Sequence, residues 1–260
     1  VVTGTTLEPR QGNPPPRLVE TPGGILNSIG LQNPGIQHFL QEELPFLQQF
    51  QPPIIVNISG NTVEEFGHLA QLLDGRVSGI EINVSCPNVK EGGLVFGTDP
   101  NQVYQVVQRV RKKTRLPLIT KLSPNVGDLV SIAQAAMDAG SDILSLINTI
   151  LAMEIDLEQG KPSFANVFAG LSGPAIRPIA LRMVYQVYEA LQVPIIGMGG
   201  ISTGEDALKF VMAGAQAIAI GTANFVDPQA SCRIWQEMQG IMNKLGVSDH
   251  QSLVGKAQGG

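Results

Sequence analysis

The chain has 260 residues, a formal net charge of -5, 43% hydrophobic residues and 15% charged residues. This length admits one large α/β domain or two small ones, and the composition excludes intrinsic disorder. The negative charge excludes a nucleic-acid surface, which needs clustered Lys and Arg. No apolar run approaches the roughly 20 residues needed to cross a bilayer, and the 2 cysteines form no metal-ligand cluster. We expect a cytoplasmic protein that binds no metal, nucleic acid or membrane.

Short β-branched runs alternate with longer helical stretches along the whole sequence. Strands separated by helices predict right-handed βαβ units and a parallel sheet that is buried on both faces. The expected strands span residues 1–4, 53–60, 79–86, 117–124, 142–149, 194–201 and 217–224. The expected helices span residues 62–73, 100–114, 127–139, 176–191 and 203–213, with a closing helix and tail from Ser231 onward.

The segment 7–50 is rich in Pro, Gly and Asn and fits no simple strand-helix unit. Long insertions of this kind in compact domains are usually lids or binding loops. We therefore expect an irregular active-site insertion that folds over the mouth of the domain.

Polar residues gather at the C-terminal ends of the expected strands. A (β/α)8 barrel builds its site at that face, whereas a doubly wound sheet concentrates ligand groups at one switch point. The pattern favours an α/β fold, a single (β/α)8 TIM barrel over residues 1–260. The strand-end residues are Asn57, Ser59, Asn83, Cys86, Lys121, Ser123, Asn148, Thr149, Gly199, Gly200, Gly221 and Thr222.

The sequence carries seven strand signals, whereas a closed barrel of this class needs eight. An open barrel would expose two unpaired edges. Because the first run, VVTG, already resembles an interior strand, we expect that the first strand is missing and would precede Val1.

The segments GMGGIS and AIAIGTA place glycines at the ends of the last two expected strands. Glycine lets backbone N–H groups approach an anion, and a helix N-terminus adds favourable dipole charge. Gly199, Gly200 and Gly221 thus predict a phosphate site that Gly173 completes, and FMN would fit. The alternative is that these glycines only relieve packing.

Lys121 lies inside the otherwise apolar strand LITKLSP. A buried ammonium is costly without a negative partner. A reduced flavin is one candidate partner, and the carboxylate of Glu81 is the other.

Cys86 lies between Asn83 and Asn88 at the end of a strand. A free cysteine is usually a small buried apolar residue, and we interpret Cys232 in this way. Flanking amides can hold a planar substrate while the Cys86 thiol removes a proton.

Five asparagines lie at expected loop or strand ends and suggest recognition of imide or amide groups, although each could cap the local backbone. The three histidines have no metal-like spacing, so we expect them at the surface. The asparagines are Asn27, Asn57, Asn83, Asn88 and Asn148, and the histidines are His38, His68 and His250.

Six motifs together resemble the class 1 dihydroorotate dehydrogenases over nearly the whole chain. The cysteine of SCPN is typical of class 1, since class 2 enzymes carry serine there. NVKEGGLVFGTDP and NTILAMEID are most similar to the class 1B catalytic subunit. The six motifs are TTLEPRQGNPPPR, NSIGLQNPG, INVSCPNVKEGGLVFGTDP, TKLSPN, INTILAMEID and GMGGIS.

This resemblance implies oxidation of (S)-dihydroorotate to orotate in pyrimidine biosynthesis, with FMN as cofactor. Cys86 would take the C5 proton while C6 delivers hydride to FMN. The implied substrate residues are Asn27, Ser28, Ile29, Gly30, Leu31, Asn83, Asn88, Asn148 and Thr149. The implied flavin residues are Gly4, Asn57, Asn83, Lys121, Ile147, Gly173, Gly199, Gly200, Gly221 and Thr222.

The resemblance also implies a homodimer core and an iron-sulfur, FAD-carrying partner subunit that passes electrons to NAD. The chain departs from the family where Thr3 precedes Gly4, since family members carry a lysine there. The family's first strand and its serine-containing loop would lie upstream of Val1. Two alternatives stay open: a self-sufficient class 1A enzyme that reduces fumarate, and a catalytically impaired fragment or scaffold barrel.

Overall fold

The computed structural model describes residues 1–85 and 96–259. Its centre is a parallel sheet of seven strands that pair strictly in chain order. Every neighbouring pair in this sheet is parallel, and helices connect the strands. The strands are β1 (Val2–Thr5), β4 (Ile55–Ile58), β5 (Gly79–Asn83), β6 (Leu118–Lys121), β7 (Ile143–Leu146), β12 (Ile195–Met198) and β13 (Ala217–Ala219).

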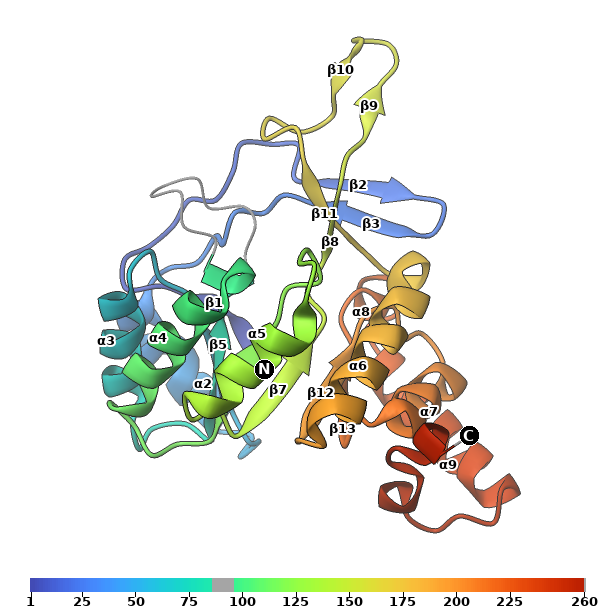
Figure 1. Ribbon diagram of the computed structural model, residues 1–260. Helices are drawn as coiled ribbons and strands as arrows, with labels where there is room; N and C mark the ends of the chain where they lie inside the picture. Colours follow the sequence, from blue (N-terminus) through green and yellow to red (C-terminus); the bar gives the residue numbers. More distant parts are fainter. Residues whose placement is uncertain (86–95, 260) are drawn as a thin grey trace.

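Helices cover the outside of this curled sheet (Figure 1). This arrangement confirms the predicted α/β barrel class, and six of the seven strands fall within a predicted run, while β1 extends one residue beyond its run to Thr5. The main helices are α3 (Val63–Leu73), α4 (Pro100–Arg111), α5 (Leu129–Asp138), α6 (Arg177–Leu191), α7 (Gly204–Ala213), α8 (Ala223–Val226) and α9 (Ala230–Lys244). Short 3-10 turns are η2 (Phe96–Thr98), η3 (Pro174–Ile176), η4 (His250–Leu253) and η5 (Lys256–Gly259).

Side-chain caps fix where several of the helices begin. Thr62, Asp99, Asp128 and Thr203 each accept a hydrogen bond from a backbone N–H in the first turn of the helix that follows. Such caps satisfy donors that the helix itself leaves unpaired. The start of each connecting helix therefore follows from its local sequence.

Along the strands, alternate residues face the helices and the barrel interior. In β5, Ile80 and Ile82 are fully buried and belong to the same apolar core as Phe66 and Leu69 of α3. Glu81 is 2% exposed and alternates with them, which sets its carboxylate on the opposite side of the sheet. The interior of the barrel therefore carries polar groups where the helix-facing side carries aliphatic ones.

A second, antiparallel sheet lies beyond the C-terminal ends of the parallel strands and forms a roof (Figure 1). Its strands, in spatial order, are β2 (Leu18–Thr21), β3 (Gly24–Asn27), β11 (Ala169–Ser172) and β8 (Ile150–Ala152). A hairpin of β9 (Ile155–Asp156) and β10 (Lys161–Pro162) projects from it.

The segment 7–50 is more regular than expected. It contributes β2 and β3 to the roof and a continuous helical run of α1 (Ile36–His38), the π-helix η1 (Phe39–Glu43) and α2 (Leu44–Gln48). The difference has a physical reason, because β3 pairs with β11 more than a hundred residues further along the chain, and local sequence carries no trace of that pairing.

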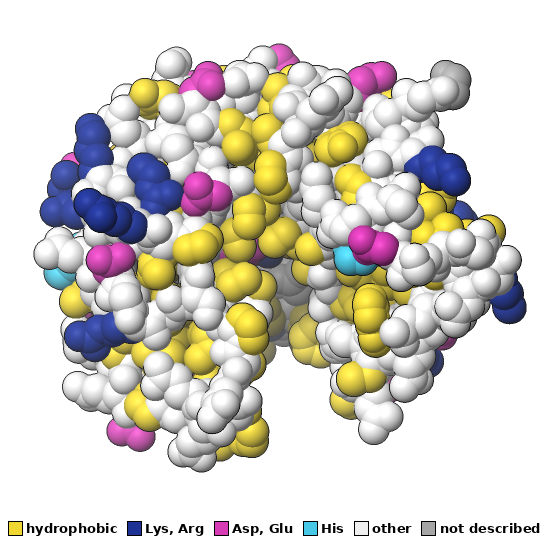
Figure 2. All heavy atoms as spheres, turned by 90° about the horizontal axis from the view of Figure 1, so that it is seen from below, with side chains coloured by type: hydrophobic (Ala, Val, Ile, Leu, Met, Phe, Trp, Pro, Cys, Tyr) yellow, Lys and Arg dark blue, Asp and Glu magenta, His cyan; other side chains and the backbone are white. Residues whose placement is uncertain are grey.

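Within the described ranges, β1 pairs only with β4, and β13 pairs only with β12, so these strands form the two edges of the sheet. Seen from below, the molecule is hollowed between two lobes, and apolar side chains line the walls (Figure 2). The eighth strand that we expect ahead of Val1 stays a prediction. Across the described residues, every helix is too short or too polar to span a bilayer.

His38 and His68 are exposed as predicted, but His250 is half-buried. Its Nε2 lies 3.3 Å from the carbonyl oxygen of Gln216, because η4 packs against α7. The prediction of a surface position therefore holds only in part for this histidine, whose side chain is 31% exposed.

Candidate functional site

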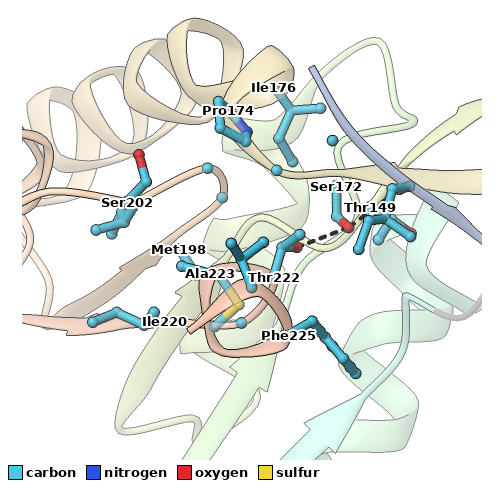
Figure 3. Close-up of a pocket in the computed structure, with 18 of the residues that line it drawn as sticks. Thr149, Ser172, Pro174, Ile176, Met198, Ser202, Ile220, Thr222, Ala223 and Phe225 are labelled. Carbon is cyan, nitrogen blue, oxygen red and sulfur yellow. Dashed lines mark hydrogen bonds between the residues drawn. The ribbon is translucent and has the colours of Figure 1, made fainter. Parts of the chain in front are cut away.

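A cavity of about 1100 Å³ opens at the C-terminal ends of β6, β7, β12 and β13, beneath the roof. Side chains from the two sheets and from the loop after β13 face one another across it (Figure 3). Nine of the predicted site residues line this cavity: Lys121, Ile147, Asn148, Thr149, Gly173, Gly199, Gly200, Gly221 and Thr222.

The glycines that follow β12 adopt conformations that other residues rarely adopt. Gly199 has φ +122° and Gly200 has φ +78°, and a Cβ on Gly200 would lie 2.6 Å from the carbonyl oxygen of Gly173. The loop therefore requires glycine for its own conformation.

Backbone donors are left free at this wall of the cavity. In the described parts of the chain, the N–H groups of Gly200, Gly221 and Thr222 donate to no backbone acceptor. Gly221 has no neighbouring atom within 4 Å of an added Cβ, so its backbone faces open space. Free N–H groups from two adjacent loops form a concave site suited to an anion.

The roof contributes to the cavity through the turn between β2 and β3, which belongs to the segment 7–50 that we expected over the mouth of the domain, although Gly24 was not among the predicted site residues. Gly24 lines the cavity, and a Cβ there would lie 1.9 Å from the carbonyl oxygen of Ser172. Ser172 in turn accepts a 2.9 Å hydrogen bond from the hydroxyl of Thr222, drawn in Figure 3. This contact joins the roof to the loop after β13.

Asp206 holds the loop between β12 and α7. Its carboxylate accepts hydrogen bonds from the backbone N–H and hydroxyl of Ser202 and from the N–H of Thr203, and it pairs with Arg177. Burial, the largest influence, raises the pKa of Asp206, but these hydrogen bonds and the Arg177 charge together lower it below its ordinary value of 3.8.

Helix α9 holds the same loop and the following one from outside. Arg233 donates a 2.8 Å hydrogen bond to Glu237 and a 3.1 Å hydrogen bond to Asp227. Glu237 in turn accepts a 2.6 Å hydrogen bond from the N–H of Gly204. The hydrogen bond from Gly204 is the main reason why the pKa of Glu237 lies below its ordinary value, and Arg233 adds to it. One arginine and two carboxylates thereby fix the two loops.

Beside the cavity, buried polar side chains form a continuous network, and Glu81 of this network is also one of the residues that line the cavity. Glu81 accepts hydrogen bonds from Asn57 at 2.5 Å and from Ser145 at 2.8 Å. Asn83 donates to Asn57 at 3.3 Å, and its own oxygen accepts the Ser85 hydroxyl at 3.0 Å. Sequence reasoning gave Glu81 only a structural role and missed both serines, although each alternates with aliphatic residues in a strand or strand end.

Lys121 is half-buried at the cavity wall. Among the described residues no ion pair joins it to Glu81, whose recorded partners are Asn57 and Ser145. The structure therefore does not support the alternative in which the Glu81 carboxylate neutralises Lys121.

The predicted residues of the NSIGL loop lie outside the cavity lining. Asn27 donates a 3.2 Å hydrogen bond to the carbonyl oxygen of Gly170. The hydroxyl of Ser28 accepts a 3.0 Å hydrogen bond from the side-chain amide of Asn13. A Cβ on Gly4 would meet the Leu31 side chain at 3.0 Å and the Asn57 side chain at 3.1 Å. Ile29 and Gly30 of this loop are half-buried.

Cys86 and Asn88 lie outside the described residues, which resume at Phe96. Ser85, the residue before Cys86, is 2% exposed. Asn148 donates to the Ser85 carbonyl at 3.2 Å and to its hydroxyl at 2.9 Å. The chain is thus held firmly up to the position where the predicted base follows.

The sequence model of the family described as dihydroorotate dehydrogenase matches residues 1–242. The chain belongs to this family. Dihydroorotate dehydrogenases are flavin-dependent oxidoreductases, so the predicted enzyme class is confirmed.

Curated relatives agree over nearly the full length of the chain. The catalytic subunit of dihydroorotate dehydrogenase B (NAD(+)) from Geotalea uraniireducens (strain Rf4) is 56% identical over 257 residues, 98% of this chain and 84% of the relative. The protein of the same description from Desulforudis audaxviator (strain MP104C) is 53% identical over 259 residues, 99% of this chain and 84% of the relative. These relatives confirm the predicted resemblance to class 1B.

Within a dihydroorotate dehydrogenase, the two halves of the cavity differ in chemistry. The side near β12 and β13 offers backbone donors and glycines, whereas the side near β5 and β7 offers amide and hydroxyl groups. The first suits a phosphate, and the second suits a planar ligand with several donors and acceptors.

Proposed function

We propose that the chain oxidises (S)-dihydroorotate to orotate in de novo pyrimidine biosynthesis and uses FMN as its cofactor. The single observation that carries this proposal is that free glycine-loop N–H groups line a cavity of about 1100 Å³ that the asparagine network reaches at Asn148. A cavity of this size accommodates a flavin together with a small ring.

The residues present fit FMN. Gly199, Gly200, Gly221 and Thr222 would receive its phosphate, with Gly173 completing the cradle. Lys121 would supply positive charge to the flavin ring, and Ile147 would pack against it. Gly4, Asn57 and Asn83 would complete the ring site from strands β1, β4 and β5. When bound, FMN supplies the acceptor for the hydride that leaves C6 of the substrate.

The chain's own residues would hold the pyrimidine and remove its proton. Cys86 would act as the base at C5, because a cysteine thiol titrates at about 8.5 and needs only modest lowering to accept a proton near neutrality. Asn27, Asn83, Asn88, Asn148 and Thr149 would bind the ring and its carboxylate, together with the loop Ser28, Ile29, Gly30 and Leu31.

The electrons would pass from this chain to NAD through a partner. The proteins from Geotalea uraniireducens and Desulforudis audaxviator are described as catalytic subunits of an NAD(+) enzyme, which supports an iron-sulfur, FAD-carrying partner subunit here. A homodimer of this chain would form the core of the assembly.

Stopped-flow measurement of flavin bleaching by dihydroorotate tests the role of Cys86. Loss of a general base costs about 10²- to 10⁴-fold in rate, so Cys86→Ala bleaches slowly, whereas Cys86→Ser recovers rate as the pH rises. Cys232→Ala is the matched control. The interpretation of Cys232 as a buried residue was wrong, because α9 buries Ile234 and Met238 and leaves this cysteine exposed. Equal bleaching rates for wild type and Cys86→Ala across the pH range would contradict the assignment. Rapid reoxidation of the lone chain by fumarate would contradict the proposed partner.

A further inference from the structure

Asn125 of the segment SPN lies in the loop between β6 and α5, outside the cavity lining. Its side chain nevertheless reaches the turn after β7, which carries the cavity residues Asn148 and Thr149. The side-chain amide donates a 3.1 Å hydrogen bond to the carbonyl oxygen of Thr149 and accepts a 2.9 Å hydrogen bond from the backbone N–H of Leu151. Asn125 thus bonds to this turn as the backbone of a neighbouring strand would.

The backbone of the turn fixes which end of the Asn125 amide faces each partner. A carbonyl oxygen only accepts, so Thr149 must face the NH₂ group, and a backbone N–H only donates, so Leu151 must face the amide oxygen. Asn125 is itself held in place, because its backbone N–H donates a 3.2 Å hydrogen bond to the hydroxyl of Ser123. Ser123 is 3% exposed, and Pro124 restricts the backbone between the two residues.

Thr149 lies where the barrel meets the roof. On the barrel side, the N–H of Asn148 donates a 3.1 Å hydrogen bond to the carbonyl oxygen of the residue that follows β6. On the roof side, Ile150 begins strand β8, which pairs with β11. Between these two anchors, the bond from Asn125 is the one hydrogen bond recorded for Thr149 within the described ranges. The orientation of the peptide group between Thr149 and Ile150, and with it the direction of the Thr149 side chain, therefore depends on Asn125.

Packing against the roof limits the space that the Thr149 side chain can occupy. A Cβ added to Gly170 of β11 would lie 2.2 Å from the Thr149 hydroxyl oxygen and 2.7 Å from the Thr149 Cβ, so the glycine leaves room for this side chain. Thr149 lines the cavity (Figure 3), and in the part of the chain that the structure describes its hydroxyl has no recorded hydrogen-bond partner. The hydroxyl is thus available to a ligand.

We infer that Asn125 is a positioning residue that holds the Thr149 hydroxyl where the site binds a pyrimidine. This inference rests on the proposed function, in which Thr149 contacts the substrate. Asn125 acts through the backbone of Thr149 and does not touch the ligand. A hydroxyl that is already held in its binding position loses little freedom of motion when a carboxylate or a ring carbonyl bonds to it, so the affinity for the ligand is higher.

A double-mutant cycle tests the inference through the orotate dissociation constant, measured by calorimetric titration of the FMN-loaded chain. Asn125→Ala removes the anchor, and Thr149→Ala removes the hydroxyl that the anchor positions. We expect each change to weaken orotate binding about tenfold, which corresponds to one lost hydrogen bond. The double variant should also bind about tenfold more weakly than wild type, because the anchor cannot act through an absent hydroxyl. The FMN affinity of Asn125→Ala should stay within about twofold of wild type.

Gln258→Ala is the matched control. The side-chain amide of Gln258 also donates to backbone carbonyl oxygens, those of Tyr185 and Ala213 at 3.0 Å each, but it lies outside the cavity lining. We expect this change to lower the melting temperature, to leave orotate affinity within about twofold of wild type, and to combine additively with Thr149→Ala. If Asn125→Ala does not fold, Asn125→Ser replaces it in the same cycle, because the shorter serine side chain cannot bond to both sides of the turn.

Four results would overturn the inference. The first is unchanged orotate affinity in Asn125→Ala or in Thr149→Ala, and the second is a loss of about a hundredfold in the double variant. The third is an FMN affinity that falls as far as the orotate affinity in Asn125→Ala, and the fourth is a loss of orotate affinity in Gln258→Ala equal to that in Asn125→Ala. Failure of the wild-type chain to bind orotate would instead overturn the proposed function, and the inference with it.

Discussion

Two glycines of the cavity wall have different physical reasons for being glycine. Gly200 has φ +78°, and its Cβ would clash with the backbone of Gly173, so the fold itself excludes a side chain there. Gly221 has no atom within 4 Å of an added Cβ and no positive φ. At Gly221, a side chain would conflict only with a molecule that enters the cavity.

Gly221→Ala therefore separates binding from folding. We expect the melting temperature to stay within about 1 °C of wild type while the FMN dissociation constant rises about tenfold, because the methyl group intrudes where the phosphate would lie. Gly127→Ala is the control, since Gly127 also has nothing within 4 Å but lies outside the cavity lining. Thermal melting and flavin fluorescence titration measure the two quantities. Wild-type FMN affinity in Gly221→Ala would refute the cradle.

At the scale of elements, helix α7 begins directly after the glycine-containing loop that follows β12 and lines the cavity. Thr203 and Asp206 form a capping box, and Asp206 also accepts from Ser202 and pairs with Arg177 at the start of α6. One carboxylate therefore fixes the start of one helix, the loop after β12 and the neighbouring helix. The loop's shape depends on that carboxylate being ionised.

Asp206→Asn is expected to destabilise the chain by about 2 kcal/mol at neutral pH, because the amide cannot replace all of the accepted hydrogen bonds and leaves Arg177 unpaired. The pKa of Asp206 in the folded chain lies below its ordinary value of 3.8. The carboxylate therefore contributes stability above about pH 4, and this stability is lost as the pH falls through the folded-state pKa.

Urea unfolding at pH 7 and pH 3 checks this prediction. The gap between wild type and Asp206→Asn should narrow at the lower pH. Glu189→Gln, on an exposed position of α6, provides the baseline for a lost surface charge. A gap that is equal at both pH values would show that ionisation of Asp206 contributes nothing to stability.

The strands of the barrel could be predicted from sequence because each is a short β-branched run between turn signals. The roof could not, because β11 is the sequence AGLS and gains its strand geometry from β3 and β8. The glycines of the cavity wall were predictable from their positions at strand ends. The polar network around Glu81 was not, since it depends on which side chains meet across β4 and β5 in three dimensions.

At the scale of the whole molecule, strand β11 connects the two sheets. It pairs with β3 and β8 in the roof and then runs through Gly173 into η3 and α6 of the barrel. The contact between Gly24 and Ser172 lies at this junction, and the cavity is enclosed between the sheets. The geometry of the site therefore depends on how closely the roof approaches the barrel.

Gly24→Ala is expected to separate the roof from the barrel, because the added Cβ would lie 1.9 Å from the carbonyl oxygen of Ser172. This oxygen belongs to the backbone, so a change of side-chain rotamer cannot relieve the clash. We expect near-native helical circular dichroism, faster proteolysis within residues 18–27, and loss of both FMN and orotate binding of about tenfold or more. Limited proteolysis and ligand titration measure these effects, with Gly127→Ala as control. Retention of wild-type affinity for both ligands would show that the barrel alone shapes the cavity.

The clamp of Arg233 and Glu237 on the loops after β12 and β13 has a consequence for biosynthesis. Ribosomes release the chain from its N-terminus, so residues 199–204 and 221–227 emerge before the helix that fixes them. The cavity wall reaches its final shape only when α9 has left the exit tunnel and docked. Cofactor loading is therefore expected only after α9 has been synthesised, and a ribosome-bound nascent chain stalled before Arg233 should carry no flavin.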